Sequence, residues 1–385
     1  MIPVDPESPA ARPLAIGITC YPSVGGSGIL ASELGEQLAQ RGHAVHFISY
    51  DRPFRMPVGQ NVHFHKVQVN DYNLFKYPDY TLPLSVKMAE VSERYSLDVL
   101  HVHYAVPHAT AAILARAMLP AGVRRPRVVT TLHGTDTTLL GRDPAYSPAI
   151  RHALEHSDAI TTVSEFMQAE TVRLLQVRRP IEVIHNFFEP RLPRRSRDEV
   201  RRELGVGGGE ALLLHSSNLR PMKRIDLLLE TVARLRGRLA FKLVILAGGD
   251  FGPFQGQVRA AGLSEHVVVR ESVAEIEDYL HAADLGVFSS ESESFCLSIL
   301  ELMSVGVPSV AFAVGGIPEV VTAQTGRLLP FGDTAALALA IESLICSPAM
   351  RQTRGQAGVA RARAQFSAAA IVPHYEAVYV GGASA

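Results

Sequence analysis

Residues 290–310 read SESESFCLSILELMSVGVPSV, and two glutamates in this stretch, Glu293 and Glu301, are separated by seven residues. From the point between them, apolar residues recur at helical spacing, at Leu297, Ile299, Leu300 and Met303. A helix that opens at Phe295 or Cys296 leaves Glu293 in the preceding loop and places Glu301 in its second turn. With a rise of about 1.5 Å per residue, the two carboxylates then lie roughly 10 Å apart along the helix axis, about the length of a sugar diphosphate.

The start of this predicted helix is also a candidate anion site. The amides of Phe295, Cys296 and Leu297 have no partner within such a helix, and the helix dipole adds positive charge there. A carboxylate, an anion site and a second carboxylate in line suit a nucleotide sugar. One acid would bind sugar hydroxyls, the amides the diphosphate, and the other acid the ribose. For this stretch alone, a buried amphipathic helix with two exposed acids is the simpler interpretation.

The composition favours an α/β protein of two or three domains and argues against partners such as nucleic acid or a membrane surface. The chain has 385 residues, and its 37 Lys+Arg nearly cancel its 38 Asp+Glu. Hydrophobic residues make up 47% and aromatic residues only 7%, with no Trp, which is typical of a core of Val, Leu, Ile and Ala.

Cysteine usage and the short apolar runs indicate a soluble protein of the reducing cytoplasm. Cys20, Cys296 and Cys346 are odd in number and far apart, so we expect neither a disulfide framework nor a metal-binding Cys pair. Residues 1–13 contain no apolar core of a signal peptide. The longest apolar run, 109–119, is interrupted by Arg116 and is far shorter than the ~20 residues of a membrane span.

Short apolar runs alternate with helical patterns, which predicts βαβ units and mostly parallel sheets. We expect strands at 14–19, 45–49, 62–69, 99–102, 128–131, 159–163, 181–184, 212–216, 243–247, 267–269, 285–288 and 309–311. In the first half we expect helices at 28–41, 84–95, 107–118, 147–156 and 165–175. The pattern restarts after an arginine-rich passage, so we predict domains at 1–189 and 190–365 and a C-terminal helix, 366–385, that crosses back to the first domain. Ligands of such sheets bind outside the carboxyl ends of the strands, which predicts a cleft between the domains.

A glycine-rich loop, Gly25-Gly26-Ser27-Gly28, follows the first predicted strand and opens a helix. It matches the dinucleotide-binding pattern, and Asp51 lies after the second strand, where a ribose-binding acid would be. A nicotinamide-dependent dehydrogenase is therefore an alternative. The same loop serves any phosphate, because glycine amides at a helix N-terminus bind the anion whatever is attached to it, and it can also be a turn without a ligand.

Histidines gather at the ends of two predicted strands, in His101-Val-His103-Tyr104 and in His133-Gly-Thr-Asp136. Imidazoles and a carboxylate are good metal ligands, but no Cys or His-x3-His partner is nearby. We therefore favour His133 as a hydrogen-bonding partner of a substrate hydroxyl over a metal site.

Cations follow the first strand of the second half, in the turn that contains Asn218, Arg220, Lys223 and Arg224. Arginine makes bidentate contacts and lysine a point charge to a diphosphate, although a solvated helix start is the simpler interpretation of this turn alone. A helix N-terminus lowers a thiol pKa, but no general base is placed for Cys296, which we expect to pack or to offer its backbone.

Together these motifs resemble retaining glycosyltransferases of family four, which have the α/β GT-B fold of two Rossmann-like domains facing a cleft. The resemblance rests on GGSG, the 218–223 turn, AGGD at 247–250, Glu293-x7-Glu301, GVP at 306–308 and GGIPE at 315–319. The stretches GITCYPSVGGSG, HVHYAVPH, TTLHGTDTTLLG, IHNFFEP and SSNLRPMKR resemble the members of this family that act in bacillithiol biosynthesis.

That resemblance implies UDP-N-acetylglucosamine as donor, L-malate as acceptor, retention of the α configuration and no metal requirement. It implies the donor-binding set Gly25, Gly26, Asn218, Arg220, Lys223, Arg270, Glu293, Phe295, Cys296, Leu297 and Glu301. Within this set, Glu301 binds the ribose, Lys223 the diphosphate and Glu293 the sugar, and the uracil is read by backbone near Arg270. Much of the family carries an arginine where Asn218 stands, so either Asn218 or Arg220 joins Lys223, and we favour Arg220.

The resemblance implies a catalytic set of Lys223, Glu293, His133 and Arg220, with His133 near the sugar 6-hydroxyl. For the dianionic acceptor it implies Ser27, Tyr104, Thr131 and Arg151. Retention without an evident nucleophile favours same-face substitution, in which the departing diphosphate takes the acceptor proton. A family member with another small or lipid acceptor and a non-catalytic nucleotide-sugar sensor remain alternatives, and homo-oligomerisation is open.

Overall fold

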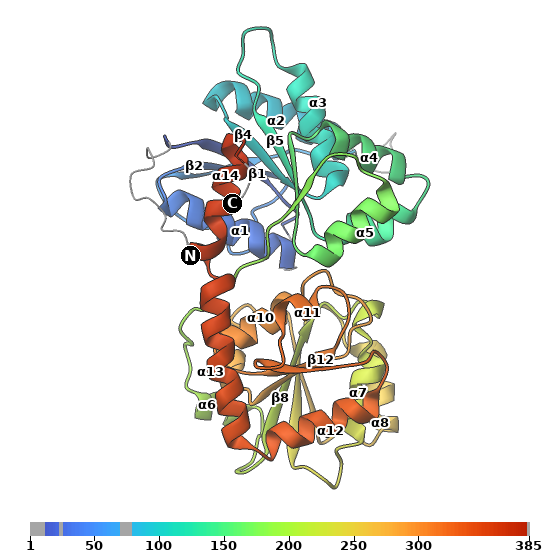
Figure 1. Cartoon of the computed structure of the whole chain (residues 1–385). Helices are drawn as coiled ribbons and strands as arrows, with labels where there is room; N and C mark the ends of the chain where they lie inside the picture. The colour runs from blue at the N-terminus through green and yellow to red at the C-terminus, as the bar shows by residue number, and fades with distance from the viewer. Residues whose placement is uncertain (1–11, 23–25, 70–78, 383–385) are drawn as a thin grey trace.

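The computed structural model describes residues 12–22, 26–69 and 79–382. They form two α/β lobes, one above the other in Figure 1, and each lobe is built around one parallel sheet. In the described ranges the first sheet has the order β3-β2-β1-β4-β5-β6-β7 and the second the order β10-β9-β8-β11-β12-β13. The first comprises β1 (Ala15–Thr19), β2 (Ala44–Ser49), β3 (Val62–Lys66), β4 (Val99–His103), β5 (Arg127–Leu132), β6 (Ala159–Thr162) and β7 (Ile181–Val183). The second comprises β8 (Ala211–Ser217), β9 (Phe241–Ala247), β10 (Val267–Glu271), β11 (Leu285–Phe288), β12 (Ser309–Phe312) and β13 (Gly326–Leu329).

Helices connect these strands as crossovers, and the sequence marks several of their beginnings. Ser164 caps one helix by accepting a hydrogen bond from the Met167 amide, and Ser196 and Glu199 form a capping box at another. The helices of the first half are α1 (Gly26–Gln40), α2 (Thr81–Tyr95), α3 (Thr110–Met118), α4 (Ser147–His156) and α5 (Glu165–Leu175). Those of the second half are α6 (Arg197–Glu203), α7 (Ile225–Ala233), α8 (Gln255–Ala260), α9 (Glu277–Ala282), α10 (Leu297–Ser304), α11 (Ile317–Val320), α12 (Thr334–Ile345), α13 (Pro348–Gln365) and α14 (Ala368–Val380).

The central strands of both sheets, such as β1, β8 and β9, are buried on both faces, which explains why they are largely continuous apolar runs. In β8, Leu212 and Leu214 join one apolar cluster, whereas Leu213 points to the other face and joins a second cluster. In each sheet the strand order reverses beside the first strand, at β1/β4 and at β8/β11. These switch points open crevices at the carboxyl ends of the strands, where the predicted motifs lie.

The predicted strands of both halves are present, and the differences lie where the local signal is weak. Strand β13 was not predicted, because its sequence GRLL has only two apolar residues; it lies at the sheet edge. The predicted helix start at Phe295 or Cys296 is wrong, because Cys296 has left-handed backbone angles, φ 73° and ψ 73°, and α10 begins at Leu297. The predicted start at 107 is likewise replaced by a π-helical turn, Ala105–Ala109, before α3.

The C-terminal helices lie on different lobes (Figure 1). Helix α13 contacts α10 and α12 of the second sheet, whereas α14 contacts α1 and β5 of the first. Where the chain passes from α13 to α14, the Phe366 carbonyl accepts a hydrogen bond, 3.1 Å long, from the Phe188 amide. We propose domain limits at 189/190 and 365/366 because these contacts change lobe there.

A membrane-spanning helix is not found among the residues that the structure describes. No single helix there is both long and apolar enough, and the only pair that passes on length and composition, Thr334–Ile345 with Pro348–Val380, is bent by 98°.

Helix α13 packs against the loop after α10 through a glycine, which gives a test of this contact. A Cβ added at Gly355 would lie 2.1 Å from the Gly306 carbonyl oxygen, a backbone atom that cannot rotate away. We expect Gly355→Ala to lower the free energy of unfolding by about 1–3 kcal/mol, measured by urea denaturation. The matched control is Gly256→Ala in α8, where an added Cβ meets nothing within 4 Å and the helix should gain about 0.5–1 kcal/mol. An unchanged urea midpoint for Gly355→Ala would contradict the contact.

Candidate active site between the two lobes

A cavity of about 640 Å³ lies between the two lobes at the carboxyl ends of their strands. It brings together most of the predicted site residues, from both halves of the chain. These are Gly26, Ser27, Tyr104, His133, Asn218, Arg220, Lys223, Glu293, Phe295, Cys296, Leu297 and Glu301. Gly25, which belongs to the same predicted loop, lies outside the described residues.

Two predicted acceptor residues do not line this cavity. Thr131, on β5, is fully buried, and its hydroxyl bonds to His101 Nε2 at 2.7 Å and to the Thr161 hydroxyl at 2.6 Å. Arg151 is exposed on α4. The sequence placed Thr131 at a strand end and Arg151 on the helix after HGTD, but it could not show which way their side chains point.

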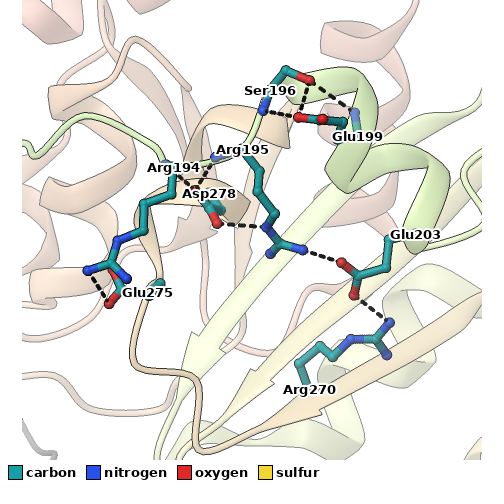
Figure 2. Close-up of polar contacts among 8 residues, drawn as sticks. All are labelled: Arg194, Arg195, Ser196, Glu199, Glu203, Arg270, Glu275 and Asp278. Atoms are coloured by element: carbon teal, nitrogen blue, oxygen red, sulfur yellow. Dashed lines mark hydrogen bonds and ion pairs between the residues drawn. The ribbon is translucent and has the colours of Figure 1, made fainter.

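Arg270 lies in a different place, in a surface hollow along β10. Its guanidinium donates to Glu203 Oε1 at 3.2 Å, and Glu203 also pairs with Arg195, which in turn pairs with Asp278 at 2.8 Å (Figure 2). This chain of ion pairs joins β10, α6 and α9. In the described structure the Arg270 side chain is therefore engaged outside the cavity.

Lys223 and Glu293 form the central ion pair of the cavity, with 2.6 Å between Nζ and Oε1. The same carboxylate oxygen accepts a hydrogen bond from the Ser290 hydroxyl at 2.7 Å. Burial disfavours the charge on Lys223, but the adjacent Glu293 outweighs it and holds the pKa of the ammonium above its ordinary value. Lys223 is therefore a fixed cation facing the cavity.

Glycines after β12 hold the loop of Glu293 in place. The Gly316 amide donates to the Glu293 carbonyl at 2.9 Å. At Gly315, φ is 55° and an added Cβ would lie 2.0 Å from that carbonyl oxygen. The GG pair of the GGIPE motif is therefore required by the close approach of two backbones.

Glu301 lies in the second turn of α10, as predicted, but it is buried, with 4% of its surface exposed. Burial raises the pKa of its carboxyl to about 7, and the positive charge of Arg55 opposes that rise. Arg55 comes from the first lobe and reaches across to Glu277, 3.0 Å away, and to the Ala274 carbonyl, 2.6 Å away. Arg55 was not predicted as a site residue, because it lies in an irregular segment and belongs to no motif.

His133 follows β5 and forms a hydrogen bond with a second histidine, His103. Its Nε2 lies 2.8 Å from His103 Nδ1, and burial lowers the pKa of His133 to about 3, so the imidazole is neutral. Asp136 accepts hydrogen bonds from the amides of Ala105 and Gly134, at 3.1 Å and 3.2 Å, which links the loops after β4 and β5. The adjoining hydroxyls of Ser27 and Tyr104 are 2.7 Å apart.

The lobes also touch beside the cavity. A Cβ added at Gly134 would lie 2.0 Å from the Ser294 hydroxyl, and the Ser164 hydroxyl donates to the Ser294 carbonyl at 2.6 Å. Glu319 accepts hydrogen bonds from the Glu165 and Phe166 amides at the N-terminus of α5, at 2.8 Å and 2.9 Å. These contacts fix the first lobe against the loop that carries Glu293.

Cys296 does not have the features of a nucleophile. Burial, together with the negative charge of Glu293, raises the pKa of its thiol well above the ordinary value. Among the residues that the structure describes, no group of three or more His, Cys, Asp and Glu side chains could hold a metal ion.

The arrangement can bind a molecule with three chemically distinct parts. Lys223 and Arg220 line the cavity as cations, Glu301 as a buried carboxyl, and His133 and Glu293 as further polar groups. A molecule that combines an anionic part with hydroxylated parts matches this set of groups.

Both halves of the chain match known families of glycosyltransferases. The family model of Glycosyltransferase Family 4 matches residues 24–192, and that of glycosyl transferases group 1 matches residues 196–361. An N-acetyl-alpha-D-glucosaminyl L-malate synthase of Bacillus anthracis is 40% identical over 370 residues, 95% of this chain and 96% of that protein. A D-inositol 3-phosphate glycosyltransferase of Geodermatophilus obscurus is 28% identical over 93% of this chain and 85% of its own.

Solved structures share the fold at lower identity. Sucrose-phosphate synthase from Thermosynechococcus elongatus superposes with a TM-score of 0.79 at 22% identity, covering 95% of this chain and 98% of that one. HepE of Anabaena, solved in complex with UDP and glucose, gives a TM-score of 0.79 at 19% identity, covering 96% and 100%. With two family models across both lobes and a relative 40% identical along nearly its whole length, this chain belongs to glycosyltransferase family 4 and has the GT-B architecture.

Proposed function

We propose that this glycosyltransferase transfers N-acetylglucosamine from UDP-N-acetylglucosamine to the hydroxyl of L-malate, with retention of the α configuration. The products are N-acetylglucosaminyl-α-malate and UDP, which makes the reaction the first step of bacillithiol biosynthesis. The observation that carries the proposal is the 40% identity, over 95% of the chain, to a protein named for this activity.

In the second lobe we assign the donor. Glu301 takes the ribose hydroxyls, Lys223 with Arg220 takes the diphosphate, and Glu293 takes the sugar hydroxyls. The supporting observation is that these residues line one cavity, with the cation Lys223 beside Glu293 and with Glu301 one helical turn beyond Leu297. The amides of Gly26, Phe295, Cys296 and Leu297 and the side chain of Asn218 complete the assigned site.

In the first lobe we assign the sugar 6-hydroxyl to His133 and the acceptor to Ser27 and Tyr104, which line the cavity. Arg151 and Thr131 stay predictions without support from their positions, and so does a uracil site near Arg270. The metal-independence and the cytoplasmic location expected from the sequence also remain proposals.

The proposed chemistry is a same-face substitution. The bond between the sugar C1 and the β-phosphate oxygen breaks, the malate hydroxyl oxygen bonds to C1 on the same face, and the hydroxyl proton passes to the departing phosphate. Glu293 is a poor candidate for a covalent nucleophile, because one oxygen accepts hydrogen bonds from both Lys223 and Ser290. The protein then orients both substrates and stabilises the charge of the leaving phosphate.

The decisive experiment is to incubate the full chain with UDP-N-acetylglucosamine, with and without L-malate, in the presence of a chelator, and to measure UDP release. We expect release that depends on malate and continues with the chelator. Release with other hydroxy acids but not malate would identify a different acceptor. Binding of the donor without any release would indicate a sensor, and quenching of NAD fluorescence would favour the dehydrogenase alternative.

Lys223→Ala should lower kcat more than it weakens donor binding, because the ammonium stabilises charge that develops only as the phosphate departs. We expect kcat to fall about 100-fold, while the Kd for UDP, measured by calorimetry, rises less than tenfold. Lys242→Ala is the matched control, since that lysine lies on β9, outside the cavity, with its ammonium on the Glu265 carbonyl. An unchanged kcat with only a raised KM would remove this role from Lys223.

Donor binding should weaken as the pH falls through the pKa of Glu301, which burial raises to about 7. The ionised carboxylate accepts stronger hydrogen bonds from ribose hydroxyls than the protonated acid does, and the protonated fraction grows below that pKa. We therefore expect the Kd for UDP-N-acetylglucosamine, whose charge is constant in this range, to rise several-fold from pH 8 to pH 6. Glu301→Gln should bind weakly at every pH, and a wild-type Kd that is flat across this range would contradict the assignment.

A further inference from the structure

His103 and His133 form a pair whose single shared proton decides what His133 presents to the substrate. The distance between His103 Nδ1 and His133 Nε2 is 2.8 Å, and the rings stack with 5.1 Å between their centroids. His103 is fully buried at the end of β4. Its second nitrogen, Nε2, has no hydrogen-bond partner among the described residues.

Each imidazole is neutral, because burial lowers the pKa of His133 to about 3 and that of His103 well below its ordinary value. A neutral imidazole carries one proton on one nitrogen and a lone pair on the other. Two arrangements are therefore open. Either His133 Nε2–H donates to His103, which leaves a lone pair on His133 Nδ1, or His103 Nδ1–H donates to His133, which leaves a proton on His133 Nδ1.

The two arrangements differ in what is left at the buried His103 Nε2. In the first it is an N–H without a partner, and in the second a lone pair. A buried N–H without a partner is rare in proteins. The neighbouring His108 shows which kind of unpartnered ring nitrogen this region contains. Its Nδ1 lies 2.5 Å from the His103 carbonyl, which can only accept. Thus His108 Nδ1 carries the proton, and its buried Nε2, also without a partner among the described residues, is a lone pair.

We propose that His103 is a positioning residue that donates its Nδ1–H to His133 and so fixes His133 as a hydrogen-bond donor, through Nδ1–H, to an oxygen of the bound substrate. This inference rests on the proposed function for the identity of that substrate, a sugar hydroxyl or an oxygen of the acceptor. It excludes His133 as the base that removes the acceptor proton. The same-face reaction does not need that base, because the departing phosphate receives the proton.

The tautomer can be measured directly by nitrogen NMR on the full-length protein labelled with ¹⁵N-histidine. The His133 signals are assigned by their loss in His133→Asn. We expect His133 to carry its proton on Nδ1 from pH 6 to pH 8. A proton on Nε2, or signals averaged between the two tautomers, would overturn the inference.

A pair of nearly isosteric variants tests the consequence for the reaction. The amide of His103→Asn can still donate to His133 Nε2, whereas the carboxylate of His103→Asp can only accept and places a proton on His133 Nε2. Both variants are assayed above the pKa of His133 in His103→Asp, read from its ¹⁵N signals, so that Nδ1 carries no proton in that variant. We expect kcat to be about tenfold or more lower for His103→Asp than for His103→Asn, the effect of one lost hydrogen bond in the transition state. The Kd for UDP, which lacks the transferred N-acetylglucosamine, should be the same for both variants.

Equal losses of kcat in the two folded variants would overturn the inference. If the buried aspartate prevents folding, which a melting curve shows, the tautomer of the wild-type protein still decides the question. Failure of the proposed function is distinguishable, because it appears as UDP release that ignores L-malate, whatever the tautomer of His133.

Discussion

The ion pair between Lys223 and Glu293, 2.6 Å long, is the contact on which the architecture of the site depends. It joins the turn after β8 to the loop before α10, and backbone contacts reinforce it. The Glu291 amide donates to the Met222 carbonyl at 2.8 Å, and the Ser289 hydroxyl donates to the Lys223 carbonyl at 3.0 Å. Because the Gly316 amide binds the Glu293 carbonyl, the loop after β12 joins the same assembly. Three strand ends are thereby fixed around one buried charge pair.

Burial determines the charge of the surrounding groups. It raises the pKa of Glu301 to about 7 and that of Asp136 to about 6, and it lowers that of His133 to about 3. Asp136 uses its oxygens on backbone amides rather than on a ligand. The adjacent Glu293 outweighs the effect of burial on Lys223 and holds the pKa of that ammonium above its ordinary value. The cavity therefore contains the Lys223 cation, paired with Glu293, together with a neutral His133 and a weakly acidic Glu301, which suits a diphosphate that carries uncharged sugars.

The sequence predicted the fold well because its signals are local. Parallel strands buried on both faces leave continuous apolar runs, and the rule that ligands bind at carboxyl ends of strands placed GGSG, the basic turn and Glu301 on one cleft. Contacts between distant segments leave no such signal. Nothing local marks Arg55 as a partner of Glu277, or His103 as a partner of His133. The direction of the Arg151 side chain likewise depends on how α4 is rotated against its sheet.

The electrostatics of the site are a property of the two lobes together. Gly134 approaches Ser294 so closely that no side chain fits, and Arg55 crosses from the first lobe to Glu277 beside Glu301. Separating the lobes would admit water to Glu301 and His133 and return their pKa values toward those of exposed groups. The α5 amides held by Glu319 would lose their partner, because a helix N-terminus has no acceptor of its own for them. The contacts that bring the lobes together therefore help to maintain the burial that keeps His133 neutral and raises the pKa of Glu301 to about 7.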